Sequence, residues 1–137
     1  VDEARAQIQR AVSIHESLIG KGPDAGRAEH DLGVVLGHLG QLELDANRLA
    51  EGQAAMRRSI EVLERHLRAV DTPQTRMELA AAILILAETE RGAAALSHIE
   101  KGVAILDPVR GLAAANSDLR DMVTEADEML TKARATK

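Results

Sequence analysis

Residues 9–14 (QRAVSI), 57–62 (RRSIEV) and 100–105 (EKGVAI) are three versions of one short pattern. In each version two polar residues precede a small residue, and two β-branched residues follow the small one at alternate positions. The three versions are separated by forty-odd residues, and self-similarity at such a spacing indicates a helical repeat protein. The repeated pattern therefore decides how the rest of the chain is interpreted.

The similarity continues towards the N-terminal side of each version. A small residue stands seven positions before the central small residue, and a long apolar residue stands three positions before it. Residues at these spacings share one face of an α-helix. Each version therefore predicts a helix that packs closely against a neighbour. From small to apolar to small, the three sets are Ala4, Ile8 and Ala11; Gly52, Met56 and Ser59; and Ala95, Ile99 and Gly102.

The composition favours helices and excludes several kinds of site. The chain has no Phe, Tyr or Trp, so its core must be aliphatic and it offers none of these three rings for a nucleic-acid base to stack on. It has no cysteine, which excludes disulfides and thiolate metal sites. Its formal net charge of −5, with dispersed basic residues, argues against nucleic acid as a partner.

No segment has the pattern of a membrane span or a signal peptide. The longest apolar run, from Leu79 to Ala87, is too short to cross a bilayer. We therefore expect no membrane partner and a cytoplasmic location. The chain begins at Val1, without an initiator methionine, so we also expect it to be a piece of a longer protein.

Proline and glycine residues mark the ends of the expected helices. Thr72 and Asp107 each precede a proline, as an N-cap precedes the first helical residue. Asp24 is a third expected cap, and Gly20 and Gly22 are expected to end the first helix. The sequence therefore predicts helices over residues 2–19, 25–39, 49–70, 73–90, 92–106 (or 93–106) and 109–132, with 41–48 either extending the second helix or forming a loop.

Residues 32–36 (LGVVL) and 79–83 (LAAAI) carry a complementary pattern: large, small, then large again four positions after the first. Together with the three sets above, they resemble the tetratricopeptide repeat family, whose repeats pair a helix A with a helix B. The repeats exceed the family's usual length of about 34 residues. In this they look like lengthened repeats of large bacterial signalling proteins. Aliphatic residues occupy the family's usual aromatic positions at Ile8, Met56 and Ile99.

The resemblance implies an all-α solenoid of about six helices, arranged as antiparallel hairpins in a single domain over residues 1–137. Its parts would be a helix B without its helix A (1–20), two repeats (24–70 and 73–106) and a degenerate capping repeat (108–135). In the last part Arg120 occupies a position that should be small. The alternative is an ordinary helical bundle, since all amphipathic helices share this periodicity.

No arrangement of residues indicates catalysis. His30 and His38 lie a little over two helical turns apart, but a metal site would need further ligands, and the zinc-protease pattern HExxH is absent. The Gly20-Lys21 pair lacks the Ser or Thr that follows the lysine of a phosphate-binding loop. We therefore expect no enzyme activity, no cofactor and no bound metal.

In the resembled family, the helix A faces line a concave groove that binds a peptide or helix of a partner protein. The resemblance thus implies a non-catalytic protein-interaction scaffold. An alternative is self-association through the N-terminal helix, as a homodimer or as a structural module of a larger bacterial signalling protein. Carried over position by position, the groove residues are Arg27, His30, Val34, His38, Gln74, Met77, Ala81, Ile85, Asp121 and Glu125.

Overall fold

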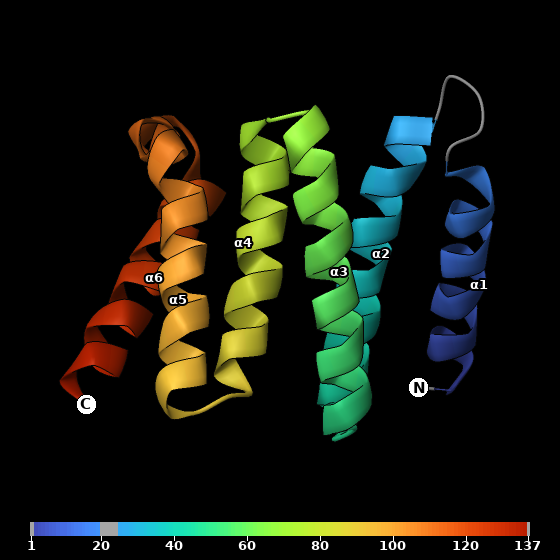
Figure 1. Cartoon of the computed structure of the whole chain (residues 1–137), viewed down its shortest axis with the longest axis horizontal. Helices are drawn as coiled ribbons and strands as arrows, with labels where there is room; N and C mark the ends of the chain where they lie inside the picture. The colour runs from blue at the N-terminus through green and yellow to red at the C-terminus, as the bar shows by residue number, and fades with distance from the viewer. Residues whose placement is uncertain (1, 20–24, 137) are drawn as a thin grey trace. The chain divides into compact units, whose positions relative to one another are not determined.

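The computed structural model describes residues 2–19 and 25–136, and their regular structure is entirely helical (Figure 1). The all-α class predicted from the sequence is therefore confirmed. The expected cap at Asp24 and the expected helix end at Gly20 and Gly22 lie outside the described residues. The elements are α1 (Asp2–Leu18), α2 (Ala25–Asp45), α3 (Leu49–Ala69), α4 (Pro73–Glu88), α5 (Gly92–Leu106), the 3-10 helix η1 (Asp107–Ala115) and α6 (Ser117–Ala135).

The helices form two compact units, Val1–Asp71 and Thr72–Lys137. The first contains α1, α2 and α3, and the second contains α4, α5, η1 and α6. The α2–α3 and α4–α5 hairpins occupy the stretches in which the sequence predicts two complete repeats.

The first unit is built on close contact between α2 and α3. A Cβ atom placed on Gly33 would lie 2.5 Å from Cδ2 of Leu63, so only glycine allows this approach. The buried hydroxyl of Ser59 donates a 2.6 Å hydrogen bond to the Gly33 carbonyl oxygen, which ties the two helices together at the same level. Helix α1 joins the pair through one apolar cluster, in which Val12 packs with Leu32 and Leu36 of α2 and with Val62 of α3.

The stretch that the sequence left open, residues 41–48, begins as a helix and ends as a turn. Helix α2 runs on to Asp45, six residues beyond the end predicted at Leu39. It stops where Asn47 takes a φ of 61°, a left-handed conformation that reverses the chain. The extension has a packing cause, because Gly40 lies against Met56 of α3 and Glu43 is buried.

The second unit begins at the predicted cap. The Thr72 hydroxyl oxygen accepts a 3.1 Å hydrogen bond from the Thr75 backbone N–H, and Pro73 is the first residue of α4. Helix α4 ends at Glu88, two residues before the predicted end, and α5 begins at Gly92 as expected. The two helices approach closely at Gly102, where an added Cβ would lie 2.9 Å from Cδ2 of Leu84.

The prediction of one helix over residues 109–132 is wrong. The segment forms η1 and then α6, and the break falls at Asn116, whose backbone is extended (φ −137°, ψ 104°). The Asn116 side-chain oxygen accepts a 3.1 Å hydrogen bond from the Leu119 N–H, so Asn116 is the N-cap of α6. The prediction that Asp107 is an N-cap is also wrong. The backbone of Asp107 is helical, and its carboxylate accepts a 2.6 Å hydrogen bond from Arg110 Nε.

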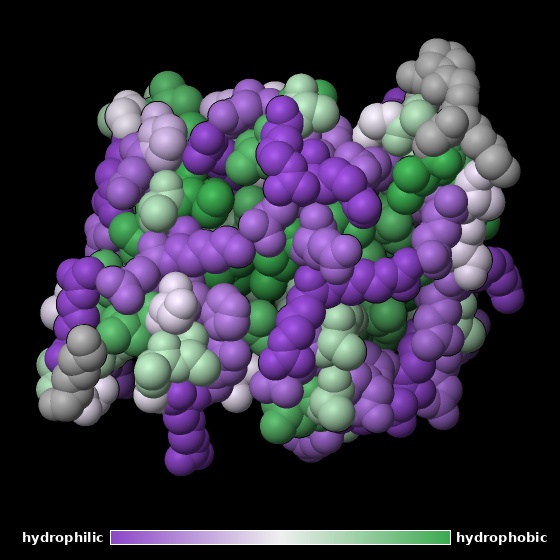
Figure 2. Space-filling model, in the orientation of Figure 1, coloured by the Kyte–Doolittle hydropathy of each residue, from purple (hydrophilic) through white to green (hydrophobic). Residues whose placement is uncertain are grey.

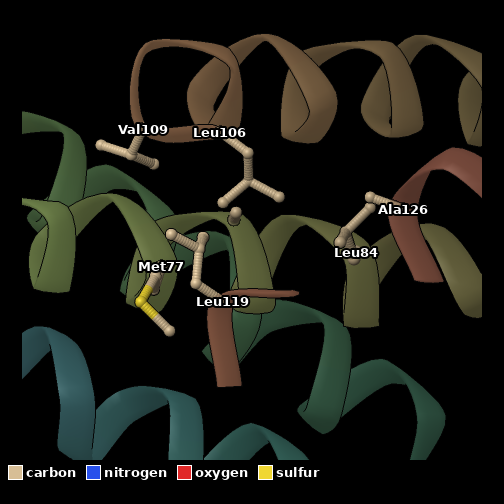
Figure 3. Packing of buried hydrophobic residues seen from close by; sticks show 7 residues of the cluster. Met77, Leu84, Leu106, Val109, Leu119 and Ala126 are labelled. Carbon is tan, nitrogen blue, oxygen red and sulfur yellow. The ribbon is translucent and has the colours of Figure 1, made fainter. Parts of the chain in front are cut away.

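A core joins all four helices of the second unit. Figure 3 shows its side chains converging from α4, η1 and α6, together with Leu106 at the end of α5. Leu106, Leu119 and Ala126 are fully buried. Aliphatic side chains thus build this core without an aromatic ring, as the composition requires.

Candidate functional site

The four predicted groove residues of the first unit lie along α2 with different exposures. Arg27 and His38 are exposed, whereas His30 and Val34 are half-buried. The His30 ring lies 5.2 Å, centroid to centroid, from the ring of His66 on α3. Part of the His30 side chain therefore packs against α3.

The surroundings of His66 are those of an ion-pair cluster. Arg65 Nε lies 2.9 Å from Glu29 Oε2, and His66 Nδ1 lies 3.7 Å from the other oxygen of that carboxylate. Within the described part of the chain, no group of three or more His, Asp or Glu side chains has the geometry to hold a metal ion.

In the second unit, four predicted residues line one hollow between α4 and α6. Ala81 and Ile85 come from α4, and Asp121 and Glu125 come from α6. The hollow has a volume of about 270 Å³, and we call it the α4–α6 hollow. Its lining is completed by Leu84, Glu88, Asp118 and Met122, which are not among the groove residues predicted from the sequence.

The two remaining predicted residues lie elsewhere. Gln74 is exposed near the start of α4, outside the lining of the hollow, and its amide donates a 2.7 Å hydrogen bond to Glu78. Met77 is 8% exposed and belongs to the core of the second unit, where Figure 3 shows its side chain. A substitution at Met77 would therefore test the stability of the unit and not the binding surface.

The α4–α6 hollow concentrates negative charge. Glu88, Asp118, Asp121 and Glu125 line it, and none of the four is paired with a basic side chain among the described residues. Partial desolvation of its carboxylate, and then repulsion by Glu125, raise the pKa of Glu88 above its ordinary value. By contrast, the carboxylate of Asp127, which also lies on α6, accepts two hydrogen bonds from Arg110, at 2.9 and 2.6 Å, and these lower its pKa.

A larger hollow of about 780 Å³ lies between the end of α4, α5 and the last turns of α6. Leu96, Ile99 and Met129 are among its apolar residues. Its charged residues are of both signs, and two of the acidic ones are paired within the chain. Glu90 pairs with His98, and Glu100 lies 3.4 Å from Arg134 Nη2. This hollow therefore shows no charge preference for a ligand.

The outer surface is mainly hydrophilic on the face shown in Figure 2, with small hydrophobic patches between the polar side chains. None of the described helices combines the length and the apolar character that crossing a membrane requires.

The α4–α6 hollow is the place where residues assigned to the groove from the sequence meet in space. Helical spacing alone could have identified the two acidic lining residues that were not predicted. Glu88 lies seven residues after Ala81 on α4, and Asp118 lies seven residues before Glu125 on α6, so each shares a helix face with a predicted residue. Comparison of this chain with protein-family models, with characterised protein sequences and with solved structures finds no match.

Proposed function

We propose that this chain is a non-catalytic protein-interaction module whose α4–α6 hollow receives a segment of a partner protein. The supporting observation is that Ala81, Ile85, Asp121 and Glu125, which the resemblance to tetratricopeptide repeats assigns to a groove, line this hollow together. Concave sites with an apolar lining and a few polar groups are the usual places for ligands. We also propose that the hairpins are tetratricopeptide-like repeats and that the module serves a larger bacterial signalling protein in the cytoplasm.

The small residues between the helices support the repeat proposal. Gly33 and Gly102 stand where α2 meets α3 and where α4 meets α5, and each is in contact with a leucine of the neighbouring helix. In a repeat array each hairpin presents one face to its neighbours and one to partners. The α4–α6 hollow is formed between α4, an expected helix A, and α6, which lies in the stretch where the degenerate capping repeat is expected.

Selection from a library of displayed peptides tests the proposed function. The full chain serves as bait, and the affinity of each enriched peptide is then measured with the purified chain. The variant Ile85→Asn removes apolar surface from the hollow, and Leu112→Asn is its control because Leu112 is 49% exposed and does not line the hollow.

We expect Ile85→Asn to weaken the selected peptides about tenfold or more and Leu112→Asn to leave their affinity unchanged. Circular dichroism must show that both variants keep the helical content of the parent chain. An absence of enriched peptides, or equal affinity for the parent chain and Ile85→Asn, would contradict binding in this hollow.

A second candidate function is self-association through α1. Ile14 and Leu18 lie one helical turn apart on α1 and are 53% and 45% exposed, respectively. A second copy could bury both through a two-fold contact. Sedimentation of the parent chain, of Ile14→Gln/Leu18→Gln and of the control Leu49→Gln tests this candidate. A dimer that only the α1 variant dissociates is expected, and a monomer at all concentrations would exclude it.

A further inference from the structure

The α4–α6 hollow has an apolar floor between acidic walls. Leu84 is 4% exposed at its base, and Ala81, Ile85 and Met122 are half-buried around it. Its four carboxylate side chains, in contrast, are all exposed: Glu88 on α4, and Asp118, Asp121 and Glu125 on α6. A ligand that fills the floor is therefore flanked by negative charge from both helices.

The acidic walls differ from most other acidic positions of the described chain. Glu16, Glu29 and Asp127, for example, each lie within 3 Å of an arginine nitrogen. The four carboxylates of the hollow have no such partner among the residues that the structure describes. Glu88 and Glu125 also repel one another, since the charge of Glu125 contributes to the raised pKa of Glu88. An incoming cation would relieve this repulsion.

The spacing of the acids indicates the length of the complementary segment. Asp118 and Glu125 are seven residues apart on α6, which is about 10 Å along a helix. Ala81 and Glu88 cover the same length on α4. A bound segment would thus meet the hollow over about two helical turns, with apolar contacts in the middle and charges on either side.

We propose that the α4–α6 hollow binds a basic amphipathic segment of a partner protein, in which bulky apolar residues are flanked by lysine or arginine. This inference rests on the proposed function and adds the chemistry of the partner. The apolar side chains would occupy the floor formed by Leu84 and Ile85, as in other helix-in-groove complexes. The basic side chains would pair with the exposed carboxylates and steer the partner to the hollow.

Three synthetic peptides of equal length test the inference with the full chain. The first carries leucine on one helical face and lysine on the other, the second replaces each lysine by glutamate, and the third replaces each leucine by serine. Affinities are measured by calorimetry near physiological ionic strength, where the screening length is about 8 Å. The Leu/Lys peptide is expected to bind, and the other two to bind at least about tenfold more weakly.

Paired variants of the chain separate the hollow from the net charge. Asp121→Asn/Glu125→Gln removes two carboxylates from the hollow. Glu3→Gln/Glu61→Gln removes two that are exposed elsewhere, on α1 and α3. The first variant should weaken the Leu/Lys peptide about tenfold, and the second should leave its affinity within about twofold. These substitutions are at exposed positions, so both variants are expected to fold.

The outcomes distinguish this inference from the function on which it rests. Equal weakening by both double variants would show attraction by net charge alone and would overturn the inference. No binding of the Leu/Lys peptide would overturn it as well. If selected neutral or acidic peptides depend on Ile85 but not on Asp121 and Glu125, the interaction function stands and the basic partner is wrong. If no selected peptide depends on Ile85, both are wrong.

Discussion

Arg48 Nε donates a 2.6 Å hydrogen bond to Glu43 Oε2, and this bond closes the turn between α2 and α3 around a buried carboxylate. Glu43 is only 3% exposed, although it is a charged residue near the end of a surface helix. Its other oxygen accepts a hydrogen bond from Arg5 of α1. One carboxylate thus links α1, α2 and the α2–α3 turn, and such a group is stable in a buried position only when it is paired.

This link predicts acid sensitivity in the first unit. Burial by itself would raise the pKa of Glu43, but the hydrogen bonds from Arg5 and Arg48 outweigh it and lower the pKa below the ordinary 4.5. A lowered carboxyl pKa contributes stability that is complete above the unfolded-state pKa and is lost as the pH falls through the folded-state pKa. Urea unfolding followed from neutral to acidic pH should therefore show stability falling below about pH 4.5.

The variant Glu43→Gln isolates this contribution. It should be less stable than the parent chain at neutral pH, because Arg5 and Arg48 lose their charged partner, and its stability should change less in acid. The control Glu3→Gln removes an exposed carboxylate from α1 and should reproduce the parent profile. Matching pH profiles for the parent and Glu43→Gln would refute the role given to this carboxylate.

Close helix contact predicts opposite effects for two glycines of α2. An added Cβ at Gly33 would lie 2.5 Å from Leu63, which is 1% exposed and cannot move aside freely. We expect Gly33→Ala to destabilise the first unit by about 1–3 kcal/mol. Gly26 has no atom within 4 Å of its added Cβ, so Gly26→Ala should stabilise by up to about 1 kcal/mol. Urea unfolding midpoints would measure both, and a gain of stability in Gly33→Ala would disprove the tight contact.

The cap at Asn116 predicts a measurable cost for its removal. Its side-chain oxygen satisfies the Leu119 N–H at the start of α6, and alanine cannot replace that bond. Asn116→Ala should destabilise the second unit by about 1 kcal/mol. Ser117→Ala alters the next, exposed residue and should change stability by less than about 0.5 kcal/mol. Thermal unfolding compares the two, and equal stabilities would mean that the break in the helix does not depend on this cap.

The raised pKa of Glu88 predicts that its ionised carboxylate destabilises the fold at neutral pH, whereas the ionised carboxylate of Glu43 stabilises it. Because the pKa of Glu88 is raised, first by partial desolvation and then by Glu125, the folded chain favours its protonated form more than the unfolded chain does. A raised carboxyl pKa lowers stability above the folded-state pKa, and the penalty disappears as the pH falls through that value. Glu88→Gln should therefore unfold at a higher urea concentration than the parent near neutral pH, and at the same concentration in acid.

The control for this experiment is Glu128→Gln, which removes an exposed carboxylate of α6 that does not line the α4–α6 hollow. It should leave the unfolding midpoint nearly unchanged at both pH values. If Glu88→Gln were less stable than the parent at neutral pH, the raised pKa assigned to Glu88 would be refuted.

Local signals predicted most of the helices. The Thr72 cap with Pro73, the stripe of residues at helical spacing in α3 and the glycine at the start of α5 each act over a few residues, so they can be recognised without the fold. The break at Asn116 also has a local signal, although the prediction of one helix over 109–132 does not contain it. An asparagine three residues before a buried leucine is a cap pattern, but continuous apolar periodicity on both sides obscured it.

By itself the sequence determined that the chain is helical, where nearly all of its helices begin, and which faces carry small residues. The tertiary structure decided that Met77 belongs to the core and that Ala81 and Asp121, forty residues apart along the chain, line one hollow. It also decided that Glu43 is buried between two arginines while Glu88 faces other acids. The reason is physical: helix propensity and capping depend on neighbours within a turn or two, whereas burial and charge pairing depend on which distant helix packs alongside.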